Sequence, residues 1–260
     1  MNRILATLLL LIALAQHGQA QDGADRSLFL RAQRVMLFEE GPEQVLYWEF
    51  PDSTGLWAAA PEHIRAVIDY QDSLRWALGE VTFMAAVDRQ AKQDQDSARA
   101  VETMDGDAYN AMLVHTGSAG RVRPMNALEG EVLNYQASRY PLFSHPTEFH
   151  GFITRHTSGR IRFYFAASDT EWPPHPTLIL QRLETDLEEG WTLIGHLHNH
   201  FNQRHDHYVG TLAPSLADAQ YYGMLVERFG LQKAYITNGL HTVELKADEL
   251  GAFAAHGDDE

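Results

Sequence analysis

The sequence predicts an α/β protein with a mixed sheet, because helical and strand-like patterns alternate through the second half of the chain. A helical pattern covers Ala127 to Tyr140, and strand-like apolar runs follow at Phe149 to Thr154 and Ile161 to Ala166. An apolar segment from Thr177 to Leu183 then precedes Trp191 to Ile194, which is expected to form a buried strand. The order of these elements is the main ground for the α/β assignment.

The C-terminal elements continue the pattern. A second helix is expected after Pro214-Ser215, where apolar residues share one helical face and Gly230 occupies the position of a C-terminal stop. Two strands, Ala234 to Thr237 and His241 to Leu245, flank the turn pair Asn238-Gly239. The chain is therefore expected to close on a β-hairpin.

The N-terminal half has a different character. Residues 21–105 are expected to be mainly helical, because apolar residues from Ile64 to Leu78 recur at roughly helical spacing. A polar, charged stretch from Ala91 to Gly106 indicates a boundary, so residues 106–250 are assigned to the α/β domain. Residues 251–260 are expected to be a flexible tail.

The first twenty residues have the features of a secretory signal. Arg3 supplies a positive start, Ile4 to Ala15 an apolar run, and Gly18-Gln19-Ala20 a cleavage site of small residues. The apolar run is about a dozen residues long and falls short of the roughly 20 that span a bilayer. We expect a mature chain that begins near Gln21, is periplasmic or secreted, and has no stable membrane anchor after cleavage.

Charge and cysteine content narrow the possible functions. The formal net charge of −15 argues against a nucleic-acid partner, whose phosphates are bound mainly by Lys and Arg. The chain has no cysteine, which excludes disulfides and a thiolate nucleophile. Any metal site must therefore be built from histidines and carboxylates.

A candidate metal site follows the buried strand. His198 and His200 are two residues apart, so on an extended chain their imidazoles point the same way and can converge on one ion. Asp218 lies one turn inside the helix expected after Pro214-Ser215. Two histidines and one carboxylate leave the fourth position of a zinc ion open, as in catalytic zinc sites. The alternatives are a helix cap for Ser215 and a solvated first-turn acid for Asp218.

A hydrolase also needs a base, and Glu148 is the candidate, at the entrance to an apolar strand. Three motifs then occur in order: Pro-x-Glu-x-x-Gly from Pro146, Gly-x-x-His-x-His from Gly195, and Pro-Ser-x-x-Asp from Pro214. This order resembles the JAMM motif of the JAB/MPN metallopeptidases. The resemblance covers roughly Ala127 to Leu245.

The resemblance implies a role for each matching residue. His198, His200 and Asp218 would bind one Zn²⁺ per chain, Glu148 would activate the water, and Ser215 would stabilise the oxyanion. It also implies a JAB/MPN-like (cytidine-deaminase-like) curved mixed sheet with flanking helices. The substrate would be a peptide or protein, cleaved at a peptide or isopeptide bond.

The chain departs from the family pattern in and after the histidine pair. Asn199 stands where the family usually has Ser or Thr, and Phe201 where it usually has Pro. Fourteen residues separate His200 from Ser215, about twice the family spacing, which indicates an insertion. The insertion contains His205-Asp206-His207, for which a solvated loop, a cleft-shaping role or a second metal site is open.

Other assignments of nearby residues also stay open. His196 could complete a three-histidine site, but we place it outside the ligands because Asp218 would otherwise be unexplained. His150 is expected to be a packed strand residue or a donor behind the ligands. Glu129 and Glu131 are alternative bases, but they lie within the helix predicted over Ala127 to Tyr140 and are expected to be solvated face residues.

Three other functions compete with a JAMM-type peptidase. A non-catalytic, histidine-rich metal-buffering protein of the periplasm is suggested by the five histidines between positions 196 and 207. A zinc amidase acting on cell-wall peptides would share the site and differ in substrate. An MPN-like scaffold without metal is the third. Metal stoichiometry and substrate profiling separate these possibilities.

Overall fold

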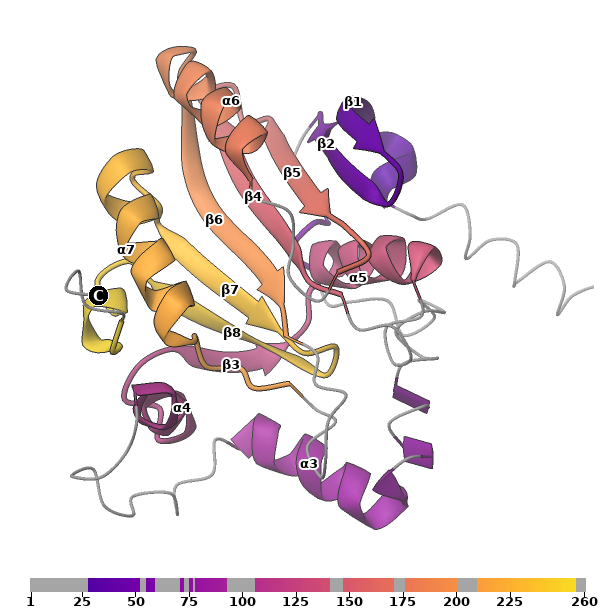
Figure 1. Ribbon diagram of the computed structural model, residues 1–260, viewed down its shortest axis with the longest axis vertical. Coiled ribbons are helices and arrows are strands. Elements are labelled where there is room, and N and C mark those ends of the chain that lie inside the picture. Colours follow the sequence, from indigo (N-terminus) through magenta and orange to yellow (C-terminus); the bar gives the residue numbers. More distant parts are fainter. Residues whose placement is uncertain are drawn as a thin grey trace, which may run out of the picture.

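The computed structural model describes residues 28–51, 55–58, 71–72, 75–76, 78–92, 106–140, 147–170, 176–200 and 210–255. Eight strands form one mixed sheet in the order β1-β2-β5-β4-β6-β7-β8-β3, as Figure 1 shows. The strands are β1 Gln33–Glu40, β2 Glu43–Phe50, β3 Arg121–Pro124, β4 Phe149–His156, β5 Ile161–Ala167, β6 Trp191–Asn199, β7 Lys233–Thr237 and β8 His241–Lys246. Within this sheet β6 and β7 are parallel, and the other neighbouring strands are antiparallel.

Five α-helices and two short 3₁₀ helices with both ends described accompany the sheet, and residues 71–72, 75–76 and 78 are also helical. The α-helices are α3 Glu80–Lys92, α4 Gly106–His115, α5 Ala127–Arg139, α6 Thr177–Glu188 and α7 Leu216–Phe229, and the 3₁₀ helices are η1 Leu28–Arg31 and η4 Leu250–Ala252. No helix in these ranges is both long and apolar enough to cross a membrane.

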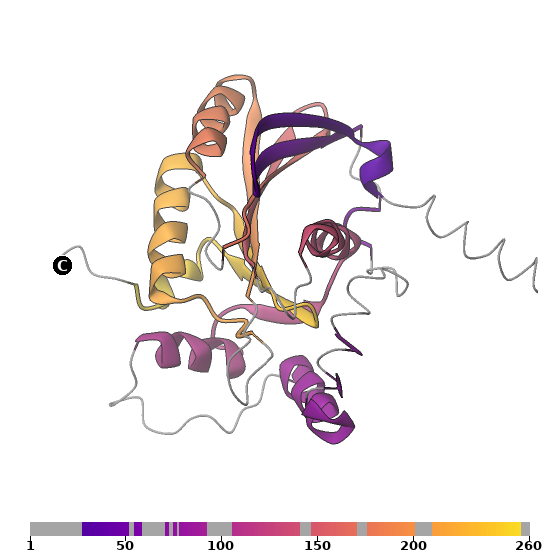
Figure 2. The ribbon, with the colours of Figure 1, turned by 45° about the vertical axis from the view of Figure 1, so that its right-hand side comes forward.

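The helices cover both faces of the sheet (Figure 2). On one face, α6 and α7 pack on a core that includes Phe152, Leu193 and Tyr222. On the other face, the β1–β2 hairpin curves over α5, and Trp48, Leu128 and other large side chains form a second core. The sheet therefore separates two apolar layers, as expected for an α/β domain.

Two helices begin at reciprocal capping boxes, which fix where each helix starts. In α5 the Asn126 side chain accepts from the N–H of Glu129, and the Glu129 carboxylate accepts from the N–H of Asn126. Ser215 and Asp218 make the same exchange at the start of α7. Gly230 ends α7 in the left-handed conformation with φ of 67°, where a residue without Cβ avoids strain.

The expected α/β pattern after residue 106 agrees with the structure at each element named from the sequence. The helix over Ala127 to Tyr140 is α5, and the three strand runs that begin at Phe149, Ile161 and Trp191 lie in β4, β5 and β6. The closing hairpin is β7 and β8, and the apolar segment from Thr177 to Leu183 lies in α6. Helix α4 and the four-residue strand β3 were not predicted.

The expectation of a mainly helical region over residues 21–105 is wrong for residues 33–50. These residues form β1 and β2, and β2 pairs with β5, so the hairpin belongs to the same sheet as the site. The period-2 signal was present: Leu46, Trp48 and Phe50 face the α5 layer, and Val45 faces the α6–α7 layer. Helix α3 agrees with the expectation, and residues 61–70 lie outside the described residues.

The expected flexible tail is wrong for residues 251–254. Phe253 is buried, and the N–H and C=O of Ala254 hydrogen-bond to the Asn110 side chain. Residues 256–260 and the expected signal segment, residues 1–20, lie outside the described part of the chain.

Candidate metal centre

The candidate site lies where β6 ends and α7 begins. His198 is the second-last residue of β6, and His200 follows the strand, with its N–H bonded to the carbonyl of Thr237 on β7 at 2.8 Å. Asp218 lies in the first turn of α7, where the capping box fixes its backbone. Because β6 is central in the sheet and α7 packs across it, three side chains from two elements meet at one point.

The three side chains offer ligand atoms that lie within 4.8 Å of one another. The Nε2 atoms of His198 and His200 are 2.8 Å apart. Asp218 Oδ1 is 3.5 Å from His198 Nε2, and its Oδ2 is 3.3 Å from His200 Nε2. Among the described residues this is the one group of three or more His, Cys, Asp or Glu side chains with metal-ligand spacing.

Each histidine is held from behind through its other ring nitrogen. The Tyr222 hydroxyl lies 2.8 Å from His198 Nδ1, and both groups are buried. His200 Nδ1 donates to the carbonyl of Thr211 at 3.0 Å. When Nδ1 carries the ring hydrogen and donates it to such a partner, Nε2 of the neutral imidazole keeps its lone pair for a metal ion. Metal-binding histidines are commonly oriented in this way. Both Nε2 atoms are thus turned toward Asp218.

The electrostatics of the group favour a cation. Burial alone would raise the pKa of Asp218, but the charges and hydrogen bonds of His198 and His200 hold it well below its usual range. Burial would lower the pKa of His200, yet the hydrogen bond to Asp218 and the charges of Asp218 and Glu148 raise it to about 8. The carboxylate is therefore ionised, and a metal ion competes with a proton for His200 Nε2.

Ser215 is bound to Asp218 by three hydrogen bonds. The Ser215 hydroxyl donates to Asp218 Oδ2 at 2.8 Å, its N–H donates to the same oxygen at 2.9 Å, and its oxygen accepts from the N–H of Asp218 at 3.1 Å. Ser215 therefore caps the helix, as considered from the sequence. Ser215 also orients the Asp218 carboxylate, because two of the three hydrogen bonds end on Oδ2.

Glu148 lies near the group and is positioned by a fully buried side chain. Burial is the main cause that raises the pKa of Tyr222, and the charges of Asp218, Tyr221 and Glu148 add to it. The charge of Glu148 also adds to the effect of Asp218 that raises the pKa of His200. The residues on either side of Glu148 are held by Asn199: its Oδ1 accepts from the N–H of Phe149 at 3.0 Å, and its Nδ2 donates to the carbonyl of Thr147 at 2.8 Å. Asn199 has no exposed surface.

His196 and His150 form a separate pair behind the ligands. His196 Nε2 lies 3.1 Å from His150 Nδ1, and the His196 ring packs against Phe152, Tyr221 and Tyr222. Burial lowers the pKa of His196 well below its ordinary value, with the charges of His150 and His198 acting in the same direction. His196 is therefore a neutral core residue and is not part of the three-ligand group.

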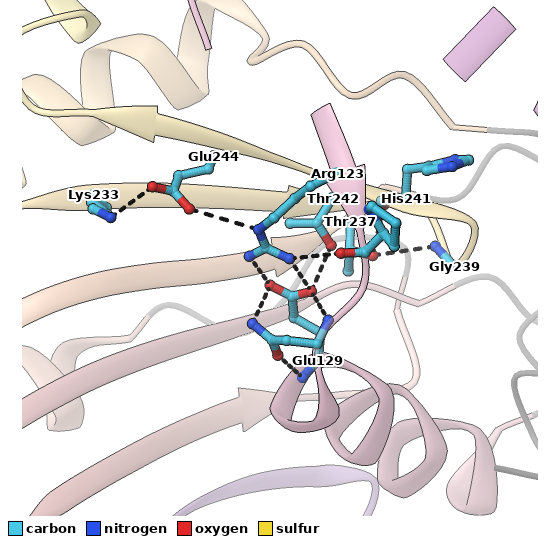
Figure 3. A network of polar contacts seen from close by, with 10 residues as sticks. Arg123, Glu129, Lys233, Thr237, Gly239, His241, Thr242 and Glu244 are labelled. Carbon is cyan, nitrogen blue, oxygen red and sulfur yellow. Dashed lines mark hydrogen bonds and ion pairs between the residues drawn. The ribbon is translucent and has the colours of Figure 1, made fainter. Parts of the chain in front are cut away.

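The expectation that Glu129 and Glu131 are solvated is wrong, because both are buried and have structural roles. Arg123 donates to both carboxylate oxygens of Glu129, which also accepts from Asn126 and from the Thr242 hydroxyl (Figure 3). Glu131 is buried and accepts from the N–H of Leu28. Both belong to α5, on the sheet face opposite α7, so neither reaches the metal ligands.

Sequence reasoning missed Tyr222 and the role of Asn199. Tyr222 is four residues after Asp218 on α7 and therefore shares its helical face, a spacing that could have identified it. Asn199 was noted only as a departure from a family pattern. Pro146, Phe201 and the His205-Asp206-His207 segment lie outside the described residues.

Comparisons with protein-family models, with curated proteins and with solved structures found no match to this chain.

Proposed function

We propose that the protein is a zinc-dependent hydrolase of peptide or isopeptide bonds with a JAB/MPN-like fold. One observation carries the proposal: His198 Nε2, His200 Nε2 and an ionised Asp218 carboxylate converge within 4.8 Å, and each imidazole is oriented through Nδ1. A mixed sheet with helices on both faces and the site at a strand end supports the fold assignment.

The donor set fits zinc. Two neutral imidazoles and one carboxylate are common zinc ligands, and three protein ligands leave a fourth position for water or substrate. The ionised Asp218 carboxylate and the raised pKa of His200 both favour a positive charge at this group. When bound, zinc lowers the pKa of a water molecule toward 7 and polarises a carbonyl oxygen.

The protein's own residues would complete the chemistry. Glu148 would accept a proton from the attacking water and return it to the leaving amine, as a general base and then a general acid. The proximity of its charge to His200 and the hold of Asn199 on its backbone support this role. The Ser215 hydroxyl would donate to the oxyanion, which requires it to turn away from Asp218 Oδ2.

The same proposal implies a peptide or protein substrate. The features of the N-terminal sequence imply that the protein is exported. A zinc amidase for cell-wall peptides would use the same residues, so the substrate decides between them. A metal-buffering protein would bind several ions and would not hydrolyse peptides.

Turnover of a peptide library by the mature protein tests the proposal. Glu148→Gln is expected to lower activity by about 10²- to 10⁴-fold with zinc retained, because it removes only the proton acceptor. His198→Ala is expected to lose both zinc and activity. Glu227→Gln, an exposed change on α7, and His156→Ala, at the half-buried end of β4, are matched controls and are expected to keep both. Normal turnover in either Glu148→Gln or His198→Ala, with the fold intact, contradicts the proposal.

A further inference from the structure

A second hollow lies on the sheet face opposite the candidate metal centre. It is a cavity of about 560 Å³ across β4, β6, β7, β8 and β3, bordered by the start of α5 and by Trp57. None of the residues of the candidate metal centre lines it. A volume of this size is typical of pockets for small organic molecules.

The charge of this hollow is opposite to that of the chain. Four cationic side chains line it, those of Arg121, Arg123, Arg155 and Lys233, against one acidic side chain, Glu244. The whole chain has 20 Lys and Arg against 35 Asp and Glu. A random patch of this protein would be acidic, so the four cations mark the hollow as a place that favours anions.

Two of these cations are neutralised within the protein (Figure 3). Arg123 donates to both oxygens of the buried Glu129 carboxylate, at 2.9 and 2.6 Å. Lys233 donates to Glu244 at 2.6 Å, and Glu244 is also 3.6 Å from Arg123. Burial would raise the pKa of Glu244, but Lys233, Arg123 and Arg121 lower it, so this carboxylate is ionised.

Arg121 and Arg155 are the two remaining cations, and Glu244, which lies opposite Arg121 in the β3–β8 register, is already paired with Lys233. Both arginines are exposed, and neither forms an ion pair with a carboxylate in the described ranges. Arg121 is on β3 and Arg155 is on β4, which are separated by β8, β7 and β6. Four interstrand spacings of about 4.8 Å, with an offset of about four residues along the strands at about 3.3 Å each, put their backbones about 23 Å apart, so a ligand that contacts both is elongated.

Apolar side chains line part of the surface between the two arginines, beside the mutually paired Arg123, Lys233 and Glu244. The rings of Trp57 and Tyr235 and the side chains of Met125, Ile153 and Ile194 line it. Burial raises the pKa of Tyr235 above its ordinary value, so its hydroxyl stays protonated. This surface suits a hydrocarbon or aromatic middle portion.

We propose that this hollow binds a small organic dianion, with carboxylates at its two ends and an apolar middle, between Arg121 and Arg155. The site is independent of the proposed hydrolase function, because it lies across the sheet from the metal ligands.

Calorimetric titration with linear dicarboxylates tests this site directly. Octanedioate is expected to bind at least tenfold more tightly than octanoate or inorganic phosphate, since it engages both arginines. Added salt is expected to weaken its binding because both arginines are exposed. Arg121→Gln and Arg155→Gln are each expected to weaken octanedioate binding at least tenfold. Arg228→Gln, on α7 across the sheet, is the matched control and is expected to leave binding unchanged.

Dicarboxylates also chelate metals, so the same titration is needed with the His198→Ala/Asp218→Ala double variant. Unchanged affinity in that variant supports the second site, and loss of binding there would place the ligand at the metal centre and overturn the proposal. The proposal is also overturned if wild-type protein shows no saturable binding, if octanoate binds equally well, or if the folded arginine variants bind normally.

Discussion

The side-chain oxygen of Asn199 accepts a hydrogen bond from the backbone N–H of Phe149 at 3.0 Å, and its amide nitrogen donates to the carbonyl of Thr147 at 2.8 Å. Glu148 lies between these two residues. Asn199, which lies between His198 and His200, thus holds the backbone on both sides of the candidate base.

Asn199→Ala is expected to reduce peptide hydrolysis by up to about 100-fold while zinc content stays unchanged, because a shift of Glu148 by about 1 Å is enough for such a loss. Leaving the N–H of Phe149 and the carbonyl of Thr147 unpaired is expected to cost about 1–3 kcal/mol of stability. Metal analysis, thermal unfolding and turnover are measured on the same sample. If Asn199→Ala is too unstable to isolate, Asn199→Asp, which keeps the acceptor and loses the donor, replaces it. Full activity in a folded variant would show that Asn199 does not position the base.

Two adjacent tyrosines on α7 provide a matched pair. Tyr222→Phe removes the hydroxyl that holds His198 Nδ1 and is expected to weaken zinc binding about 10- to 100-fold. Tyr221→Phe removes a buried hydroxyl that has no hydrogen-bond partner in the described residues, so zinc affinity is expected to stay the same. Competition with a chromophoric chelator measures both affinities. Equal affinities would mean that the His198 orientation does not depend on Tyr222.

Ser215→Gly separates the helix cap from the proposed oxyanion donor. Glycine at an N-cap costs only a few tenths of a kcal/mol relative to serine, so the fold and zinc content are expected to persist. Loss of the hydroxyl is expected to lower turnover by about 10²- to 10³-fold, the range for removal of one oxyanion donor. A variant that keeps its zinc and its turnover would limit Ser215 to the capping role seen here.

His241 is expected to make the metal-free protein less stable in acid. Burial lowers its pKa, so below about pH 6.5 the unfolded state takes up this proton before the folded state does. The contribution of His241 to the free energy of unfolding is therefore fully present above pH 6.5. It falls as the pH drops, by up to about 1.4 kcal/mol per pH unit for this one proton. His196 contributes in the same direction.

Urea unfolding of wild type and His241→Asn between pH 5 and pH 8 isolates the contribution of His241 to the pH dependence of the free energy of unfolding. The difference in stability between the two proteins is expected to be constant above pH 6.5 and to shift in favour of the variant below it. A difference that does not change with pH would rule out the burial of a neutral imidazole at this position.

Much of the α/β region could be predicted because its periodicities are local. The helix from Ala127 and the strands around Phe149, Ile161 and Trp191 each carry an apolar pattern of the right period. The hairpin at residues 33–50 was missed because its position depends on pairing with β5, more than 110 residues later in the chain. Its Trp48 ring stacks on Phe29 at 4.1 Å and packs in the α5 layer, a long-range contact that no local pattern reveals.

The candidate ligands could be identified from spacing, because alternation along a strand brings His198 and His200 together and a helix start places Asp218. The groups that support them could not be identified as readily. Tyr222 has a helical spacing from Asp218, but its contact with His198 depends on how α7 packs on β6. The cationic hollow was not visible either, because it gathers residues from strands that are adjacent only in the folded sheet.

The most direct test of the central claim is the zinc content of the purified protein, measured beside His198→Ala/Asp218→Ala and beside a control that removes the same residue types, His156→Ala/Asp169→Ala. The three-ligand group predicts one zinc per chain in wild type and control, and none in the site variant. Zinc retained by the site variant, or several ions per chain, would contradict a single zinc centre at His198, His200 and Asp218.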